Sequence, residues 1–368
     1  MTAAVIFLTG DVMTGRAIDQ LMPHAGDPTL RESVVTDART YVELAEQTNG
    51  PIPAPIDFSW PWGEALPLLT DFAPDVRLIN LETSITTSGE FAPRKAVHYR
   101  MHPDNVGCLT AVRPDVCALA NNHILDFGYQ GLADTLQTLV AAGIRCAGAG
   151  LGRKAAELPQ VVTLADGGRM VIVSCGMGTS GIPHGWAATD SRPGVFYVAD
   201  MSDRSAETVA ARALTFKERG DVAVVSVHWG SNWGYEVEPV QIRFAHRLID
   251  EGIDIVHGHS SHHPRPIEVY RGRLILYGCG DTIDDYEGIR TFEAFRHELR
   301  LLYFAALDVS TGELTTLTTV PMRMRRMRLE RASSEEAEWL RAAVETMSQQ
   351  FGTRVDATAG GTLTVEPR

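Results

Sequence analysis

The sequence predicts an α/β protein whose larger, N-terminal part forms a largely parallel sheet, and two patterns support this prediction. Up to about residue 265, short β-rich apolar runs alternate with helical patterns, as they do in successive β-α-β units. Beyond that point the apolar runs follow one another across tight turns such as Arg271-Gly272 and Thr311-Gly312, which is typical of antiparallel hairpins. With 368 residues, of which 44% are apolar, the chain can bury a large core.

Five apolar runs of the N-terminal part are predicted as strands, and each is followed by a polar motif. A long insertion at residues 23–63 separates the first two strands and contains a helical piece near Glu32–Gln47. Such an insertion is either a lid over a site or packing cover over the sheet edge. The predicted strands are Val5–Thr9, Val76–Ile79, Val116–Ala120, Val222–Val227 and Ile253–Val256, and the predicted helices are Gly131–Ala142, Ser205–Arg219 and Val240–Glu251.

The C-terminal part is predicted to add hairpins and one helix. Ser333 and Glu336 form a capping box in front of a helix that runs to about Gln350. Residues 354–367 are either an edge strand or a loose tail. Since no internal repeat or linker is visible, we expect one domain over residues 1–368, with the insertion as a possible lid. The hairpin strands are Ile267–Tyr270, Leu274–Tyr277, Leu301–Val309 and Leu314–Pro321.

Charge and cysteine usage exclude several classes of protein. The net charge of −13 argues against a nucleic-acid-binding surface, although a local positive pocket could still hold an anionic substrate. The five cysteines are scattered and form no C-x-x-C pair, so we expect buried free thiols rather than a zinc ribbon or a redox motif. The N-terminus lacks a signal-peptide pattern, and no run reaches the ~18 apolar residues of a membrane span. We therefore expect a cytoplasmic protein.

The first two motifs place carboxylates after strands, where ligands gather in open α/β sheets. Asp11 follows the first strand, and Arg16 lies close enough along the chain to hold a substrate anion. An N-cap aspartate at a β-α turn is the alternative. Glu82 follows the second strand beside Asn80, and a carboxylate at such a point can bridge two cations. A surface or capping glutamate is the alternative there.

The third motif, Asn121-Asn122-His123, puts two amides and an imidazole at the end of a buried strand. Burying these groups is costly unless a metal or an oriented substrate satisfies them. Asn122 suits a metal through its carbonyl oxygen, and His123 suits proton donation to a leaving group. Asp126 could fix the tautomer of that imidazole. A structural turn with a surface histidine is the alternative.

The last two motifs concentrate histidines. His228 ends the fourth strand, and the loop after it carries Trp229 and Trp233, which are either a pocket wall or part of the core. The segment after the fifth strand holds four histidines, and neutral imidazole is a common ligand of zinc and similar ions. Asp281 ends a later strand and could orient a ligand histidine. The histidines are His257, His259, His262 and His263.

In this order the motifs resemble those of the CapA family of poly-γ-glutamate capsule synthesis proteins, within the calcineurin-like metallophosphatase superfamily. The resemblance extends from Gly10 to about Val320. It implies a four-layer α/β/β/α sandwich that holds one or two divalent ions (Mn, Zn or Fe) at the strand ends. It also implies His123 as the proton donor. The metal ligands it implies are Asp11, Glu82, Asn122, His228, His259 and His262.

The sequence departs from the superfamily pattern at three points. Met13 stands where phosphatases have a histidine, which weakens one metal position. Glu82 stands where they have an aspartate. Their final Gly-His-x-His motif is Gly-His-Ser-Ser-His here, so the choice among the histidines of residues 257–263 is open.

These observations lead to the hypothesis of a metal-dependent hydrolase that cleaves an amide bond, such as a γ-glutamyl or related peptide, by metal-activated water. His123 would protonate the leaving nitrogen, and Arg16 would bind a carboxylate of an anionic small-molecule or peptide substrate. A phosphoesterase with the same site, and a non-catalytic accessory protein of capsule synthesis with a structural metal, are the alternatives. The other expected substrate contacts are Asn80, Asn121, Trp229 and Trp233.

Overall fold

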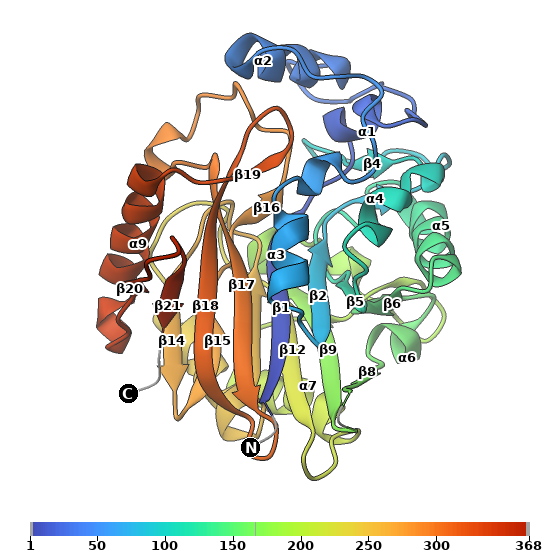
Figure 1. Ribbon diagram of the computed structural model, residues 1–368. Coiled ribbons are helices and arrows are strands. Elements are labelled where there is room, and N and C mark those ends of the chain that lie inside the picture. Colours follow the sequence, from blue (N-terminus) through green and yellow to red (C-terminus); the bar gives the residue numbers. More distant parts are fainter. Residues whose placement is uncertain (1–2, 166, 366–368) are drawn as a thin grey trace.

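The computed structural model describes residues 3–165 and 167–365, and its strands form two large sheets (Figure 1). The central strands of the first sheet, which carry the first three motifs, run parallel to one another. The C-terminal strands extend this sheet in antiparallel fashion. Its strands are β1 (Ala3–Val12), β2 (Val76–Leu81), β5 (Val116–Ala118), β6 (Arg145–Ala147), β16 (Asp281–Ile283), β17 (Leu299–Asp308), β18 (Glu313–Met324), β19 (Leu329–Arg331), β20 (Asp356–Ala357) and β21 (Leu363–Val365).

The order in the first sheet is β20-β21-β18-β17-β1-β2-β5-β6, with β16 beside β1 and β19 beside β18. β17 pairs with the first part of β1, and β16 takes its place beside Asp11 and Val12. Two-residue strands form two further small pairs, β3–β4 and β7–β10, with bounds Ser84–Ile85, Arg100–Met101, Ala149–Gly150 and Gly194–Val195.

The second sheet carries the histidine motifs. Its strands are β8 (Gln160–Thr163), β9 (Arg169–Met177), β11 (Tyr197–Val198), β12 (Val222–His228), β13 (Ile255–His259), β14 (Ile267–Tyr270) and β15 (Arg273–Leu276). The order is β11-β9-β12-β13-β15-β14, with β8 beside β9. The five predicted strands thus divide between two sheets. The alternation of strand and helix could not show this, because it is a local pattern that one sheet or two would produce equally.

Helices cover the outer face of each sheet. α3, α4 and α5 pack on the first sheet, and α7 and α8 pack on the second. α9 lies against β14 and β18 at the C-terminal side. The helices are α1 (Ala17–Leu21), α2 (Arg39–Asn49), α3 (Ala65–Asp71), α4 (Gly107–Thr110), α5 (Gly128–Ala141), α6 (Arg153–Ala156), α7 (Asp203–Leu214), α8 (Pro239–Asp250) and α9 (Ser334–Ser348).

Alternation of side chains along the strands produces the layers. On β1, Ile6 packs in the apolar cluster between the two sheets, whereas Phe7 packs in the cluster under the first set of helices. On β12, Val224 packs between the sheets and Val225 packs against α7 and α8. Since successive side chains of a strand point to opposite faces, each sheet buries both faces. The four-layer α/β/β/α sandwich is therefore confirmed.

The predicted C-terminal elements are also confirmed. β14 pairs with β15, and β17 pairs with β18, both in antiparallel register. The capping box of Ser333 and Glu336 opens α9, with reciprocal hydrogen bonds between the two residues. β20 and β21 form the outer edge of the first sheet. The five cysteines are free thiols, and four of them are buried. No helix within residues 3–165 and 167–365 combines the length and the apolar character needed to cross a bilayer.

Candidate metal centre

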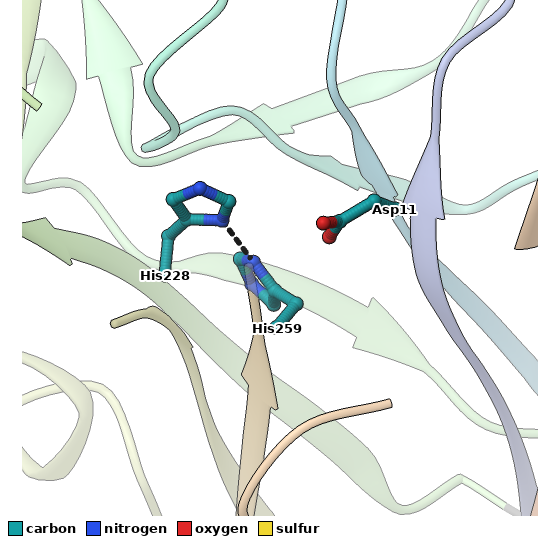
Figure 2. Close-up of side chains that lie close together, drawn as sticks. All are labelled: Asp11, His228 and His259. Atoms are coloured by element: carbon teal, nitrogen blue, oxygen red, sulfur yellow. Dashed lines mark hydrogen bonds between the residues drawn. The ribbon is translucent and has the colours of Figure 1, made fainter. Parts of the chain in front are cut away.

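The polar motifs at the strand ends meet at one place, although they come from both sheets. Asp11 lies near the end of β1 and Glu82 directly follows β2, while His228 and His259 end β12 and β13. Figure 2 shows the carboxylate of Asp11 directed toward the two imidazoles. One potential ligand atom from each of Asp11, His228 and His259 lies within 4.8 Å of the other two. Buried carboxylate and imidazole donors at this spacing can hold a divalent ion.

A second group shares Asp11 with the first. Asp11, His262 and Asp281 also place one ligand atom each within 4.8 Å of one another. The parallel pairing of β16 with β1 sets Asp281 beside Asp11. His262 follows β13 after a bend in which Ser260 has a φ of 104°, a conformation that residues with side chains seldom adopt. Asp281 Oδ1 lies 2.9 Å from His262 Nδ1, so Asp281 could orient this histidine or bind an ion with it.

Three carboxylates are buried at this place. Asp11, Glu82 and Asp281 are each at most 2% exposed. Burial, and the nearby Asp281, raise the pKa of Asp11 to about 7. Burial and neighbouring carboxylates raise the pKa values of Glu82 and Asp281 well above their usual range. These shifts mean that three negative charges are unfavourable here unless a cation joins them.

Hydrogen bonds do not satisfy these carboxylates fully. Asn80 Nδ2 donates to Asp11 Oδ1 at 2.7 Å and to Glu82 Oε2 at 3.0 Å. Asp11 Oδ2 and Asp281 Oδ2 are buried and accept no hydrogen bond within the described part of the chain. A buried polar atom without a partner costs free energy, and a bound divalent cation would remove that cost. The donor set therefore fits a metal ion.

The histidines of the first group stand in a chain of hydrogen bonds. His228 Nδ1 lies 2.8 Å from His259 Nδ1, as the dashed line in Figure 2 marks. On its other side, His228 Nε2 lies 3.1 Å from Asn122 Oδ1 and 3.7 Å from Glu82 Oε1. Ser226 Oγ supports His259 Nε2 at 2.9 Å. Burial lowers the pKa values of both histidines, so they are neutral, which is the form that binds metals.

The other two histidines of the segment use both ring nitrogens elsewhere. His257 lies between Ser226 Oγ and the carbonyl oxygen of Thr9, at 3.1 and 2.7 Å. His263 contacts the carbonyl oxygen of Pro264 and accepts a hydrogen bond from the Gly234 amide. Among the described residues, the two groups of donors around Asp11 include neither of these two histidines, but they do include His259 and His262. Their role as ligands stays a prediction.

His123 and Asp126 lie beside the first group, together with a residue that the sequence analysis missed. His123 Nδ1 lies 2.7 Å from Asp126 Oδ2, and its Nε2 lies 3.8 Å from Glu82 Oε1. Lys95 Nζ lies 2.8 Å from His123 Nδ1 and 2.5 Å from Asp126 Oδ1. Burial and the Lys95 charge lower the pKa of His123 to about 4. Lys95 lies in a loop between β3 and β4, where neither a motif nor a periodic pattern could mark it.

The side-chain amides of Asn80 and Asn121, which were predicted to touch substrate, contact each other, and Asn80 contacts Asp11 and Glu82. Asn121 Nδ2 donates to Asn80 Oδ1 at 3.1 Å and to the carbonyl oxygen of Leu81 at 2.8 Å, and both asparagine side chains are fully buried. Their contacts position Asp11 and Glu82. Trp229 packs in the core under α7 and α8 and donates to the carbonyl oxygen of Tyr277.

Arg16 is engaged by two carboxylates. Its Nε donates to Asp285 Oδ2 at 2.8 Å, its Nη2 donates to Asp285 Oδ1, and its Nη1 donates to Glu32 Oε1 at 2.8 Å. The guanidinium also lies over the ring of Tyr41, 3.8 Å from its centroid. Arg16 faces a cavity of about 260 Å³ that reaches His262.

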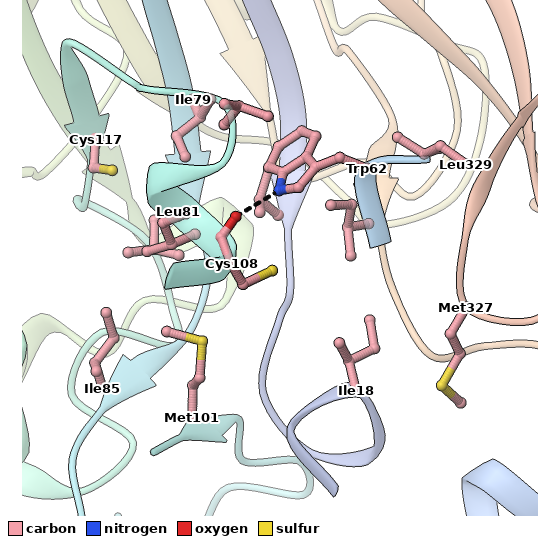
Figure 3. Close-up of a cluster of buried hydrophobic side chains, with 14 of the residues drawn as sticks. Ile18, Trp62, Ile79, Leu81, Ile85, Met101, Cys108, Cys117, Met327 and Leu329 are labelled. Carbon is pink, nitrogen blue, oxygen red and sulfur yellow. Dashed lines mark hydrogen bonds between the residues drawn. The ribbon is translucent and has the colours of Figure 1, made fainter. Parts of the chain in front are cut away.

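The insertion at residues 23–63 contributes to two separate places in the fold. Glu32 and Tyr41 line the cavity beside His262. Trp62, at the other end of the insertion, is fully buried and packs with Ile79 and Leu81 (Figure 3). Its Nε1 donates to the carbonyl oxygen of Cys108 at 2.8 Å. One part of the insertion therefore covers the first sheet, and another part forms a wall of the cavity.

Comparison with known proteins places these motifs among capsule synthesis proteins. The profile described as bacterial capsule synthesis protein PGA_cap matches residues 5–286. A protein of Mycobacterium tuberculosis named "Probable polyglutamine synthesis accessory protein" is 57% identical over 363 residues, which cover 98% of this chain and 96% of that protein. The "PGA biosynthesis protein CapA" of Bacillus subtilis is 29% identical over 247 residues, covering 66% of this chain and 63% of that protein.

Among solved structures, the protein TT1561 of Thermus thermophilus aligns over 85% of this chain and 97% of its own chain. The TM-score is 0.37 and the identity is 9%.

Proposed function

The chain belongs to the family of bacterial capsule synthesis proteins described by PGA_cap, and from that premise we propose that it is a metal-dependent hydrolase of amide bonds. One observation carries the proposal. Asp11 and Asp281 are buried side by side, each with a carboxylate oxygen that lacks a hydrogen-bond partner among the described residues, next to neutral histidines. A divalent cation is the group that best satisfies such a set of donors.

Asp11 would belong to both metal positions. His228 and His259 would complete one position with it, and His262 and Asp281 would complete the other. Asn122 and Glu82 lie beside His228 and would add oxygen donors. A bound divalent ion would supply positive charge that polarises a carbonyl oxygen and makes water a better nucleophile.

His123 is the residue proposed to move a proton. Its Nε2 faces Glu82 and the candidate metal centre, and its Nδ1 is fixed by Asp126. Asp126 is fixed in turn by Lys95 and by the backbone amide of Tyr99, which donates to Oδ2 at 2.7 Å. Because the pKa of His123 is lowered to about 4, its free imidazole is neutral, so it would first take up the proton released by the attacking water and then deliver it to the leaving nitrogen.

The charges around the centre favour an amide over a phosphoester. Three cationic side chains lie near it, and each already pairs with a carboxylate. Lys95 pairs with Asp126, Arg16 with Asp285, and Arg300 with Asp284. A phosphoryl group carries up to two negative charges and gains most from cations that are not already paired. A neutral amide has no such need.

A non-catalytic role in capsule polymer synthesis is the second candidate. The name of the Mycobacterium tuberculosis relative, which describes an accessory protein, favours it. In that case the metal would hold the strand ends together and no bond would be cleaved.

One assay separates the three candidates. The metal-free protein is loaded with Mn²⁺ or Zn²⁺ and incubated with γ-glutamyl peptides and, separately, with aryl phosphates. Metal-dependent release of amine from the peptides, lost in an Asp11→Asn variant, supports the amide hydrolase. Release of phosphate alone supports the phosphoesterase. Metal binding without cleavage of either class contradicts the hydrolase and supports the accessory role.

A further inference from the structure

The cavity beside His262 has walls from several separate parts of the chain, including the loop between β3 and β4 that carries Tyr99. The insertion contributes Glu32 and Tyr41, the loop after β12 contributes Trp233, and the loop after β16 contributes Tyr286 and Phe292. Its volume of about 260 Å³ is enough for one planar ring or a branched side chain, but not for a folded peptide.

The walls of this cavity are largely aromatic. The rings of Trp233 and Phe292 stack with centroids 3.9 Å apart. Tyr99 and Tyr286 form another wall, and the Tyr99 hydroxyl donates to that of Tyr286 at 2.9 Å. Because their hydroxyls bond to each other, these tyrosines present mainly ring carbons to the cavity. An aromatic surface of this kind stabilises apolar and planar groups.

The same walls contact the two sides of the candidate metal centre. The ring of Tyr99 lies against His123, with centroids 4.5 Å apart, and the ring of Tyr286 lies against His262 at 5.4 Å. The ring centroids of Trp233 and His262 lie 5.2 Å apart. If the scissile bond of a substrate lies at the candidate metal centre, the substituent next to that bond would therefore lie in this cavity.

The charges of the cavity oppose a free carboxylate. Arg16 supplies one positive charge, whereas Asp285 and Glu32, which hold its guanidinium, supply two negative charges. Tyr41 donates its hydroxyl to Glu32 as well. A carboxylate that entered would lose its hydration and meet aromatic carbons, and the one guanidinium on the wall already pairs with Glu32 and with Asp285 behind it, so entry is unfavourable in a partly buried site.

We propose that this cavity is the specificity pocket of the proposed hydrolase, on which the inference rests. The pocket takes a neutral aromatic or branched apolar substituent next to the scissile amide. Arg16 then has a structural role: it joins the insertion, through Glu32, to the loop that carries Asp285. The part of an anionic substrate that bears charge lies outside this cavity.

The test measures binding apart from catalysis. Calorimetry compares two small amides of similar length, 3-phenylpropanamide and the negatively charged glutaramate, on the metal-free protein and on two variants. Phe292→Ala removes one wall of the cavity. Phe216→Ala is the matched control, because Phe216 is similarly exposed (41% against 37% for Phe292) and lies far away, after α7.

The pocket predicts that the phenyl amide binds the metal-free protein at least about tenfold more tightly than glutaramate, since burial of the ring is favourable and burial of the charge is not. Phe292→Ala removes this preference and Phe216→Ala keeps it. Tighter binding of glutaramate, equal binding of both amides, no binding of either, or no effect of Phe292→Ala would overturn the pocket.

The outcomes for the pocket and for the hydrolase are distinguishable. If the phenyl amide binds as expected but metal-loaded protein cleaves no amide, the proposed hydrolase fails and the pocket stands. If amides are cleaved with a preference for a carboxylate beside the scissile bond, the hydrolase stands and the pocket fails.

Discussion

Asp11 and Asp281 lie side by side on the parallel strands β1 and β16, and each keeps its Oδ2 atom without a hydrogen bond from any described residue. In the absence of a cation this arrangement is unfavourable, because two buried like charges repel each other. This uncompensated cost is the main reason to expect a metal ion where the strand ends of the two sheets meet.

Replacing Asp281 by Asn should have opposite effects on the metal-free and metal-loaded protein. The metal-free variant should melt at a higher temperature than the wild type, because one buried and repelled carboxylate is gone. The rise in melting temperature on adding Mn²⁺ should shrink, because the variant lacks one ligand. Calorimetric melting with and without Mn²⁺ measures both effects, and Asp356→Asn, at the exposed β20, is the control. If Mn²⁺ raises the melting temperature of the Asp281→Asn variant as much as that of the wild type, Asp281 binds no ion.

Replacing His123 by Gln should slow amide cleavage without loss of metal. The side chain contacts Asp126 and Lys95 but belongs to neither metal-ligand group, so metal content should stay that of the wild type. Loss of a proton donor should lower kcat by about 100-fold or more. Steady-state kinetics on a γ-glutamyl peptide, with metal analysis of the same sample, tests this. Replacing His246, which pairs with Glu268 away from the centre, is the control. Unchanged kcat would remove His123 from the mechanism.

The stability contributed by Asp126 should depend on acid pH. Burial tends to raise the pKa of this carboxyl, but Lys95 and His123 outweigh it and hold the pKa below the usual value. A carboxyl with a lowered folded-state pKa contributes stability above its unfolded pKa of about 4 and loses that contribution as the pH falls below it.

The Asp126→Asn variant should accordingly be less stable than the wild type by about 3 kcal/mol near neutral pH, because the largely buried Lys95 loses its partner. The difference should narrow below about pH 4. Urea unfolding of both proteins across this range gives the free energies. If the difference in unfolding free energy between the wild type and Asp126→Asn stays constant down to about pH 3, Asp126 is not charged in the native state.

Ser333→Ala should cost about 1 kcal/mol of folding free energy, because the Ser333 hydroxyl accepts a hydrogen bond from the Glu336 amide at the start of α9. Ser333→Thr keeps a hydroxyl at the same point and should lose little. Chemical denaturation compares the three proteins. Equal losses for Ala and Thr would assign the effect to packing rather than to the cap.

The parts of the fold that depend on local patterns could be predicted from the sequence. α5 and α8 lie close to their predicted bounds, α7 ends at Leu214 rather than at the predicted Arg219, and the capping box correctly marked the start of α9. The division into two sheets came from the family resemblance alone. β9 is central to the second sheet and carries none of the polar motifs, so a search for motifs passed over it.

The site could be predicted in outline, because a polar residue directly after an apolar strand is a strong local signal. Asp11, His228 and His259 do lie together. The sequence could not show that β16 sets Asp281 beside Asp11. At this place Asp281 offers a carboxylate, whereas the histidine that phosphatases have at position 13 is replaced by Met13. The sequence also could not reveal Lys95, since that contact depends on the path of an irregular loop.

Metal analysis of the wild type and of an Asp11→Asn variant tests the central claim most directly, because Asp11 belongs to both groups of donors. After incubation with Mn²⁺ or Zn²⁺ and removal of free ions, the wild type should retain one or two ions per chain and the variant should retain almost none. A wild type that retains no ion, or a folded variant that retains as much as the wild type, would contradict the account.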